Sequence, residues 1–368
     1  MTTQSPGIIF IIVNTTSYDG SSSLSLDFQR DPEHVVSCRG ENTRGRAVSS
    51  RPYDWWYRSS LRRHRLLPML FMLLFFASLC EAASEPVKLV ILYPQVEGAY
   101  ARIFDEIVRG IKEHARISAS SFAVNNETKP QEIELLLKNK SAQAVLVLGQ
   151  RSYRLVQQLT TGLPTVVGAV VTPVYEYPTI SLSGDPDVFF THLKKLAPQV
   201  RRVFIVYSEA SSGWLIRIAE VAARAHGLQL IARPAKNLRA AVHHYRAILQ
   251  TAQSDRDAIW LPMDRVVPDK TILPIALDAA WKRRLVIFSS NPLSVKRGAL
   301  FALYPDHRLM GHALAELSIR QLHGNMEARV IPTRNLKLAV NQRTASHLGL
   351  RYTRQQQQGF DLVYPAPR

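Results

Sequence analysis

The sequence from residue 87 onward alternates short apolar runs with segments of helical spacing, and this alternation constrains the fold most. Residues 88–93 and 144–148 form two of the apolar runs, and Pro94 and Gly149 end them. Between these runs, residues 100–116 place their isoleucines, a phenylalanine and a valine on one helical face. Strands that alternate with helices of this length predict parallel sheets with right-handed crossovers, which makes the chain an α/β protein.

The alternation continues through two series of about four β-α units, one on each side of residues 172–186. We expect strands at 88–93, 121–125, 144–148, 164–171, 202–207, 228–232, 258–261 and 285–288. We expect helices at 100–116, 129–140, 153–160, 187–196, 213–226, 238–252, 270–282, 308–323 and 344–348, and an extended segment at 330–340. One sheet of eight or more strands is an alternative. Two three-layer α/β/α lobes are favoured, because a single core stops growing near ~250–300 residues.

Residues 61–84 have the three-part pattern of a secretory signal peptide. Arg62, Arg63 and Arg65 precede an apolar run at 66–80, and small residues follow at 82–84. The run is shorter than the ~20 residues that a membrane-spanning helix needs, so an uncleaved anchor is the alternative. We therefore expect a signal peptide at 61–83. Residues 1–60 are then an N-terminal extension that is disordered or precedes the true start of the protein.

The cysteines and the charge indicate which chemistry the mature chain lacks. Cys38 and Cys80 both precede the expected cleavage point, so the remainder can form no disulfide and no thiolate metal site. The net charge of +17 is scattered in short pairs such as Lys194-Lys195. Nucleic-acid binders more often carry a dense basic stripe with interleaved aromatic residues, so we predict no nucleic-acid partner. An exported protein without disulfides suits a bacterial periplasm.

No motif of a common enzyme class is present. The sequence contains no Gly-x-Ser-x-Gly, no P-loop, no Gly-x-Gly-x-x-Gly and no His-Glu-x-x-His. We therefore predict that the protein is not an enzyme and that it needs no cofactor and no metal.

An ordered set of short segments in the C-terminal half resembles one known family. The set comprises LPMD at 261–264, LVIFSS at 285–290, KRGAL at 296–300, a helix at Gly311, VIP at 330–332, LAVN at 338–341 and LGL at 348–350. It resembles the substrate-binding proteins of ABC transporters, in the type I periplasmic-binding branch whose members take up aromatic amino acids. The resemblance covers residues 87–352. It implies two lobes that close on a ligand around three crossing segments, near 172–182, 291–298 and 305 or 329–337.

The resemblance and the α/β pattern together divide the chain. We expect residues 87–180 with part of 300–330 to form lobe 1 and residues 181–298 to form lobe 2. Residues 299–352 supply crossing segments and closing helices, and residues 353–368 form a tail. The implied protein is a periplasmic monomer that binds a small polar ligand, such as an amino acid, between its lobes and delivers it to an ABC permease in the inner membrane. If the signal is not cleaved, the protein is membrane-anchored.

Ligands of open α/β sheets bind beyond the carboxyl ends of the strands, often at helix N-termini. This rule selects ten candidate ligand-binding residues: Gln95, Tyr100, Gln150, Ser152, Thr172, Ser208, Ser211, Asp264, Asn291 and Asp306. Ser152, Thr172 and Ser211 suit a ligand carboxylate, and Asp264 or Asp306 suits an ammonium group. Tyr100, Tyr153 and Tyr175 can stack on an aromatic ligand. The alternative for any one of these residues is a local helix cap or turn, for example Asp306 before the helix at 308.

Two other functions fit the same α/β pattern. The chain could be the ligand-sensing domain of a regulator or sensor, which would need a DNA-binding or signalling module. It could also be an exported α/β hydrolase, which would need a nucleophile constellation.

Overall fold

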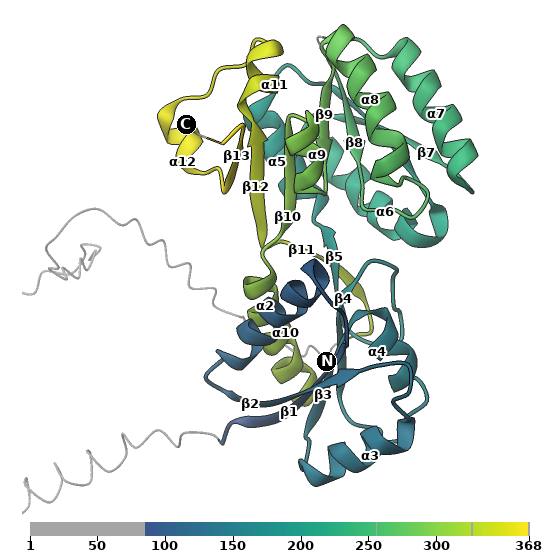
Figure 1. The fold of residues 1–368 in the computed structure, drawn as a ribbon, viewed down its shortest axis with the longest axis vertical. Coiled ribbons are helices and arrows are strands. Elements are labelled where there is room, and N and C mark those ends of the chain that lie inside the picture. The colour runs from purple at the N-terminus through teal and green to yellow at the C-terminus, as the bar shows by residue number, and fades with distance from the viewer. Residues whose placement is uncertain (1–84, 255, 325–326, 367–368) are drawn as a thin grey trace, which may run out of the picture. The chain divides into compact units, whose positions relative to one another are not determined.

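The computed structural model describes residues 85–254, 256–324 and 327–366. The predicted signal peptide at 61–83 and the extension at 1–60 lie outside the described residues. Within them, two sheets of mostly parallel strands are flanked by helices, which confirms the predicted α/β class (Figure 1). No helix of the described part of the chain is long and apolar enough to cross a membrane.

Sheet 1 has six strands in the order β11-β5-β4-β3-β1-β2, and all its pairs are parallel. Its strands are β1 (Val87–Pro94), β2 (Ile117–Val124), β3 (Ala144–Leu148), β4 (Thr165–Val170), β5 (Thr179–Gly184) and β11 (Val330–Thr333). Helices α2 (Ala99–Lys112) and α10 (His307–Leu322) pack on one face. Helices α3 (Pro130–Asn139) and α4 (Gly149–Val156) pack on the other. Apolar side chains therefore project from both faces of sheet 1, as is typical of parallel strands that are covered on both sides.

Sheet 2 has seven strands in the order β13-β12-β10-β9-β8-β6-β7. They are β6 (Arg202–Tyr207), β7 (Gln229–Pro234), β8 (Asp257–Leu261), β9 (Val286–Ser289), β10 (Phe301–Pro305), β12 (Leu336–Asn341) and β13 (Leu362–Tyr364). Strand β12 pairs antiparallel with β10, and the other pairs are parallel. Helices α5 (Pro186–Leu196) and α6 (Glu209–Ala225) cover one face, and α7 (Leu238–Thr251) and α8 (Asp269–Arg283) cover the other.

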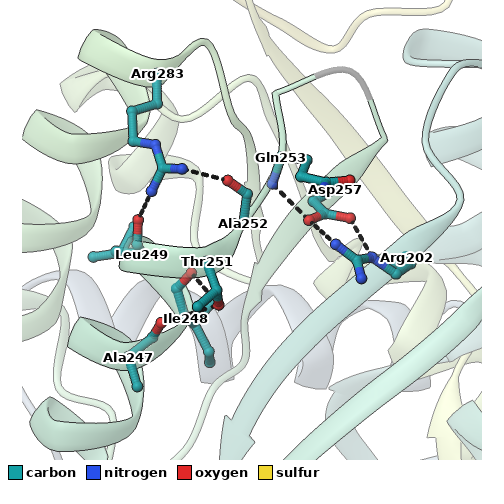
Figure 2. A network of polar contacts seen from close by, with 9 residues as sticks. All are labelled: Arg202, Ala247, Ile248, Leu249, Thr251, Ala252, Gln253, Asp257 and Arg283. Carbon is teal, nitrogen blue, oxygen red and sulfur yellow. Dashed lines mark hydrogen bonds and ion pairs between the residues drawn. The ribbon is translucent and has the colours of Figure 1, made fainter.

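Three short helices complete the chain around sheet 2. Helix α9 (Pro292–Arg297) joins β9 to β10, and α11 (Gln342–His347) and α12 (Arg354–Gln358) follow β12. The end of α7 is held by α8, because the Arg283 guanidinium donates to the carbonyl oxygens of Leu249 and Ala252 (Figure 2). A cation at the C-terminal end of a helix satisfies carbonyls that have no partner in the helix and complements the helix dipole.

The chain passes between the two sheets three times. It leaves sheet 1 after β5, returns after β10 and leaves again after β11. The crossings after β10 and β11 fall in the predicted segments at 305 and 329–337. The predicted crossing at 291–298 is wrong, since these residues form α9 between two neighbouring strands of sheet 2. The segment 172–182 leads from β4 into β5 of the same sheet, so the first crossing comes later, directly after Gly184.

Hydrogen bonds join the crossing segments to one another. The Asp185 N–H donates to the Thr333 carbonyl at 2.9 Å, and the Asp306 N–H donates to the Asn335 carbonyl at 2.9 Å. The Arg334 guanidinium donates to the Asp185 carboxylate at 2.7 Å and to the Asp187 carboxylate at 3.1 Å. Arg334 thus ties the crossing after β11 to the crossing after β5.

We expect Arg334→Ala to lower the free energy of unfolding by no more than about 1 kcal/mol, because the Arg334 side chain is 64% exposed. A hydrogen bond from His226 and the Arg334 charge lower the pKa of Asp187, against the effect of burial. A lowered carboxylate pKa gives stability that is present at neutral pH and is lost as the pH falls below the ordinary value of 3.8. Urea titrations should therefore show a larger difference between the two proteins at pH 7 than at pH 3.

Arg217→Ala is the matched control for this experiment. Its guanidinium forms a long, exposed contact of 3.5 Å with Glu209 on α6. A loss in Arg217→Ala as large as that in Arg334→Ala would show that the crossing contact has no special effect.

Candidate functional site

The three crossings define where a ligand can touch both sheets. Strands β5, β10 and β11 each lead into a crossing at their carboxyl ends. In a parallel sheet all the carboxyl ends lie at one edge, so the loops at the carboxyl edge of each sheet lie on its crossing side. Ligands of open α/β sheets bind at this edge.

In sheet 1, the candidate residues follow β1, β3 and β4. Gln95 and Tyr100 are exposed, and Tyr100 is 70% exposed in the first turn of α2. Gln150 and Thr172 are half-buried. Helix α4 begins directly at Gly149, whose φ of +76° favours glycine. A Cβ at Gly149 would lie 3.3 Å from Pro94 at the end of β1 and 3.2 Å from Phe104, so the loops after β1 and β3 are neighbours.

Ser152 is a completely buried candidate of sheet 1 with unused hydrogen-bonding capacity. It lies at the end of the first turn of α4. Its side chain is completely buried, and its hydroxyl has no hydrogen-bond partner among the described residues. A buried hydroxyl without a partner is costly, and such groups in native proteins call for an explanation. A ligand group at this carboxyl edge would supply one.

Tyr153 and Tyr175 differ in exposure. The Tyr153 hydroxyl donates to Glu176 at 2.6 Å and accepts from Gln157 at 2.7 Å. Burial, together with the Glu176 carboxylate, raises the pKa of Tyr153, so this phenol stays protonated. Its ring belongs to the core beside α3 and α4, whereas Tyr175 is exposed and free to contact a ligand.

In sheet 2, the candidates Ser208, Ser211 and Asp264 come together in one hydrogen-bond cluster. The Asp264 carboxylate accepts from the Ser208 N–H at 2.9 Å, the Ser211 hydroxyl at 3.1 Å and the Ser212 hydroxyl at 2.5 Å through Oδ2. Its Oδ1 accepts from the Val266 N–H at 2.9 Å. Asp264 is 9% exposed. The cluster fixes the start of α6 against the loop after β8, and Oδ1, with a single donor, retains capacity for a ligand ammonium group.

Asn291 and Asp306 both cap helices in the structure. Asn291 caps α9, and its side-chain amide donates to Asp269 at 2.5 Å. Asp306 caps α10 and pairs with Lys337 at 3.0 Å. Burial acts to raise the pKa of Asp306, but the Leu309 N–H and Lys337 outweigh it and the pKa is lowered. The capping alternative therefore holds for both residues, and their contact with a ligand stays a prediction.

The loop after β6 also offered Ser212, which is not among the ten candidates, and the sequence analysis missed Asp269. Ser212 contributes the shortest contact to Asp264, and Asp269 holds the Asn291 side chain. The Ser-Ser pair after β6 was a signal for the first, whereas nothing local to Asp269 indicated its contact with a residue 22 positions away.

The carboxyl edges of both sheets carry polar groups that can bind a ligand. They offer hydroxyls, amides, helix N-termini and carboxylates, which form hydrogen bonds and ion pairs with charged and polar groups. Among the described residues, no group of three or more histidine, cysteine, aspartate or glutamate side chains could hold a metal ion.

Comparisons with known proteins agree with this geometry. Residues 125–356 match the family described as ABC transporter substrate binding protein. A search of the curated proteins found no match.

Three solved structures are among the matches to this chain. A ligand-free, open substrate binding protein with adhesive properties from Clostridium difficile has 15% identity and a TM-score of 0.52, and the match covers 75% of this chain and 99% of that chain. An ABC domain in complex with L-Trp from Streptococcus pneumoniae has 17% identity and a TM-score of 0.49, over 76% of this chain and 100% of that chain. A periplasmic solute binding protein from Actinobacillus succinogenes with bound D-allose has 12% identity and a TM-score of 0.42, over 71% of this chain and 99% of that chain.

Proposed function

Because the chain belongs to the ABC transporter substrate binding protein family, we propose that it is the exported solute-binding component of an ABC uptake system. Members of this family bind small ligands, work with ABC permeases and are a non-enzymatic class. They typically act in the periplasm or outside the cell. The predicted signal peptide at 61–83 supports export, and the protein then acts as a periplasmic monomer beside a permease in the inner membrane.

The observation that carries the proposal is the set of three crossings at the carboxyl edges of two parallel sheets. Such a connection allows two α/β units to rotate about a few crossing residues while their edge loops close on a solute. Binding energy then comes from hydrogen bonds and charge pairs made by both edges, and no bond of the solute is broken. This is the mechanism that we assign to the protein.

We propose that the solute is a small zwitterion of the amino-acid class. Its carboxylate would lie at the start of α4, where the buried Ser152 hydroxyl has no partner among the described residues and the helix dipole favours negative charge. Its ammonium group would face Oδ1 of Asp264 in sheet 2. The exposed rings of Tyr100 and Tyr175 favour an aromatic or other apolar side chain over a small polar one.

A thermal-shift screen of the purified protein against the amino acids and other small polar metabolites tests this function. A bound compound at 100 times its Kd should add ~2.7 kcal/mol to the free energy of unfolding. Ser152→Ala should weaken the binding of that compound at least tenfold. It should not lower the stability of the ligand-free protein, because the lost hydroxyl has no partner among the described residues.

Ser318→Ala is the matched control. Ser318 is equally buried, but it lies on α10 and its hydroxyl donates to the Leu314 carbonyl at 2.9 Å. This change should leave the affinity for the solute as it is. If no compound stabilises the protein, or if Ser152→Ala and Ser318→Ala have the same effect on binding, the proposed site is wrong.

A further inference from the structure

A cavity of about 840 Å³ lies at the other edge of sheet 2, away from the crossings. It is lined by the second half of α8, the end of α9, the α11 helix and the chain that follows β13. Leu285 and Gly298, which precede β9 and β10, are part of its wall. Since the solute site proposed above uses the carboxyl edge, this cavity at the amino edge is a separate site.

The inner wall of the cavity is apolar. Leu285, Ile287 and Ala280 are almost completely buried, and Leu277 and Leu348 lie beside them. The buried polar residues of the wall are already paired. The Asn341 amide donates to the Val295 carbonyl at 2.8 Å, and the Thr344 hydroxyl donates to the Gly298 carbonyl at 3.0 Å. The inner wall therefore suits an apolar group.

The rim of the cavity is cationic. Lys296 and Arg297 at the end of α9 and Arg343 at the start of α11 line it, and all three are exposed. Within the described ranges none of the three forms an ion pair with a carboxylate. The acidic residue of the lining, Asp278, is paired with Lys282 at 2.9 Å. The rim thus presents unpaired positive charge beside an apolar wall.

An aromatic stack holds one side of the rim. The rings of Trp281 and His347 lie parallel with their centroids 3.7 Å apart, and the Arg343 guanidinium lies 5.8 Å from the centre of the Trp281 ring. A cation over an aromatic ring is held in place without losing its charge. Arg343 is therefore positioned to pair with an anion, and the 42% exposed Trp281 adds flat apolar surface.

We propose that this cavity binds a small amphipathic organic anion, in which an aromatic or aliphatic group carries a carboxylate or sulfonate. The apolar group would lie on the wall formed by Leu277, Leu285 and Ile287, and the anionic group would pair with Arg297 and Arg343. This ligand is a second ligand of the protein, distinct from the transported solute.

A fluorescence titration of the full chain with 8-anilinonaphthalene-1-sulfonate tests the site, because this probe is an aromatic sulfonate. The double variant Arg297→Gln/Arg343→Gln should bind the probe at least tenfold more weakly than the parent protein. Lys138→Gln/Lys140→Gln removes the same charge from the exposed end of α3 and should leave the affinity unchanged. Ser152→Ala, which alters the proposed solute site, should leave it unchanged as well.

Competition experiments test the anionic part and the apolar part of the ligand separately. Sodium 2-naphthoate should displace the probe, whereas 2-naphthylmethylammonium and inorganic phosphate should not. Displacement by the ammonium compound would overturn the role of the cations, and equal displacement by phosphate would overturn the role of the apolar wall. If Lys138→Gln/Lys140→Gln weakened probe binding as much as Arg297→Gln/Arg343→Gln, the effect would come from net charge alone, and the proposed site would be wrong. An unchanged melting temperature of each variant excludes loss of folding as the cause.

Discussion

Gly311→Ala should lower the free energy of unfolding by more than about 4 kcal/mol. Losses of this size are exceptional for a single substitution and occur where the surrounding structure cannot rearrange to accommodate the change. Helices α2 and α10 cross so closely that a Cβ at Gly311 would lie 2.2 Å from the Ile107 carbonyl oxygen and 2.9 Å from the Ile111 nitrogen. These are backbone atoms, so no side chain can rotate away. The two helices would have to separate over Ile107 and Leu314, which are both completely buried.

Gly213→Ala is the matched control for this change. Gly213 also lies inside a helix, but its Cβ would meet the flexible, exposed carboxylate of Glu209. Alanine favours a helix over glycine by up to ~1 kcal/mol, so the variant should be as stable as the parent or more stable. Urea denaturation at one pH measures all three proteins. A loss below about 1 kcal/mol in Gly311→Ala would show that the helices are not in close contact.

The effect of Gly311→Ala should extend to the crossing after β10. Arg308 in the first turn of α10 makes a two-point contact with the Glu113 carboxylate that follows α2, and its Nε lies 2.9 Å from Oε2. Because Asp306 caps the same helix and belongs to the crossing, a shift of α10 moves a segment that joins the two sheets. The close contact of α2 and α10 therefore fixes one end of the connection on which the proposed hinge depends.

The strands that the sequence predicted best are those whose faces are both covered. All five residues of β3 and all five of β8 are buried, and apart from Asp257 at the start of β8 both runs are apolar. Strand β5 was missed because its sequence, TISLSG, alternates serine and threonine with apolar residues and ends at glycine. The helix expected at 153–160 begins at Gly149 instead, since α4 follows β3 with no loop between them.

The candidate site was predictable as a set of loops but not as a set of contacts. The carboxyl-edge rule selected Ser208 and Ser211 after β6 and Asp264 after β8, and the structure joins them in one cluster. It could not show that Asp264 is held by internal donors or that Ser212 is the closest of them. Such contacts depend on how α6 docks on sheet 2, which local sequence does not encode.

Arg202→Met is expected to lower the free energy of unfolding by about 3 kcal/mol or more, because it leaves a buried carboxylate without its cation. Asp257 at the start of β8 is completely buried, and the Arg202 guanidinium donates to its two oxygens at 2.7 and 2.6 Å (Figure 2). The Gln253 N–H also donates to this carboxylate, at 2.7 Å. The pair joins the first residues of β6 and β8, which are neighbours in sheet 2.

Asp257→Leu should cost less than Arg202→Met, because the Arg202 side chain is 23% exposed and can turn its charge toward water. The double variant Arg202→Met/Asp257→Leu should be more stable than Arg202→Met alone, since no unpaired charge remains buried. Urea denaturation of the four proteins gives the coupling free energy, and neighbours in one network usually couple by 0.5–3 kcal/mol. Additive losses would show that the two side chains stabilise sheet 2 independently and that their short contacts are not what holds β6 to β8.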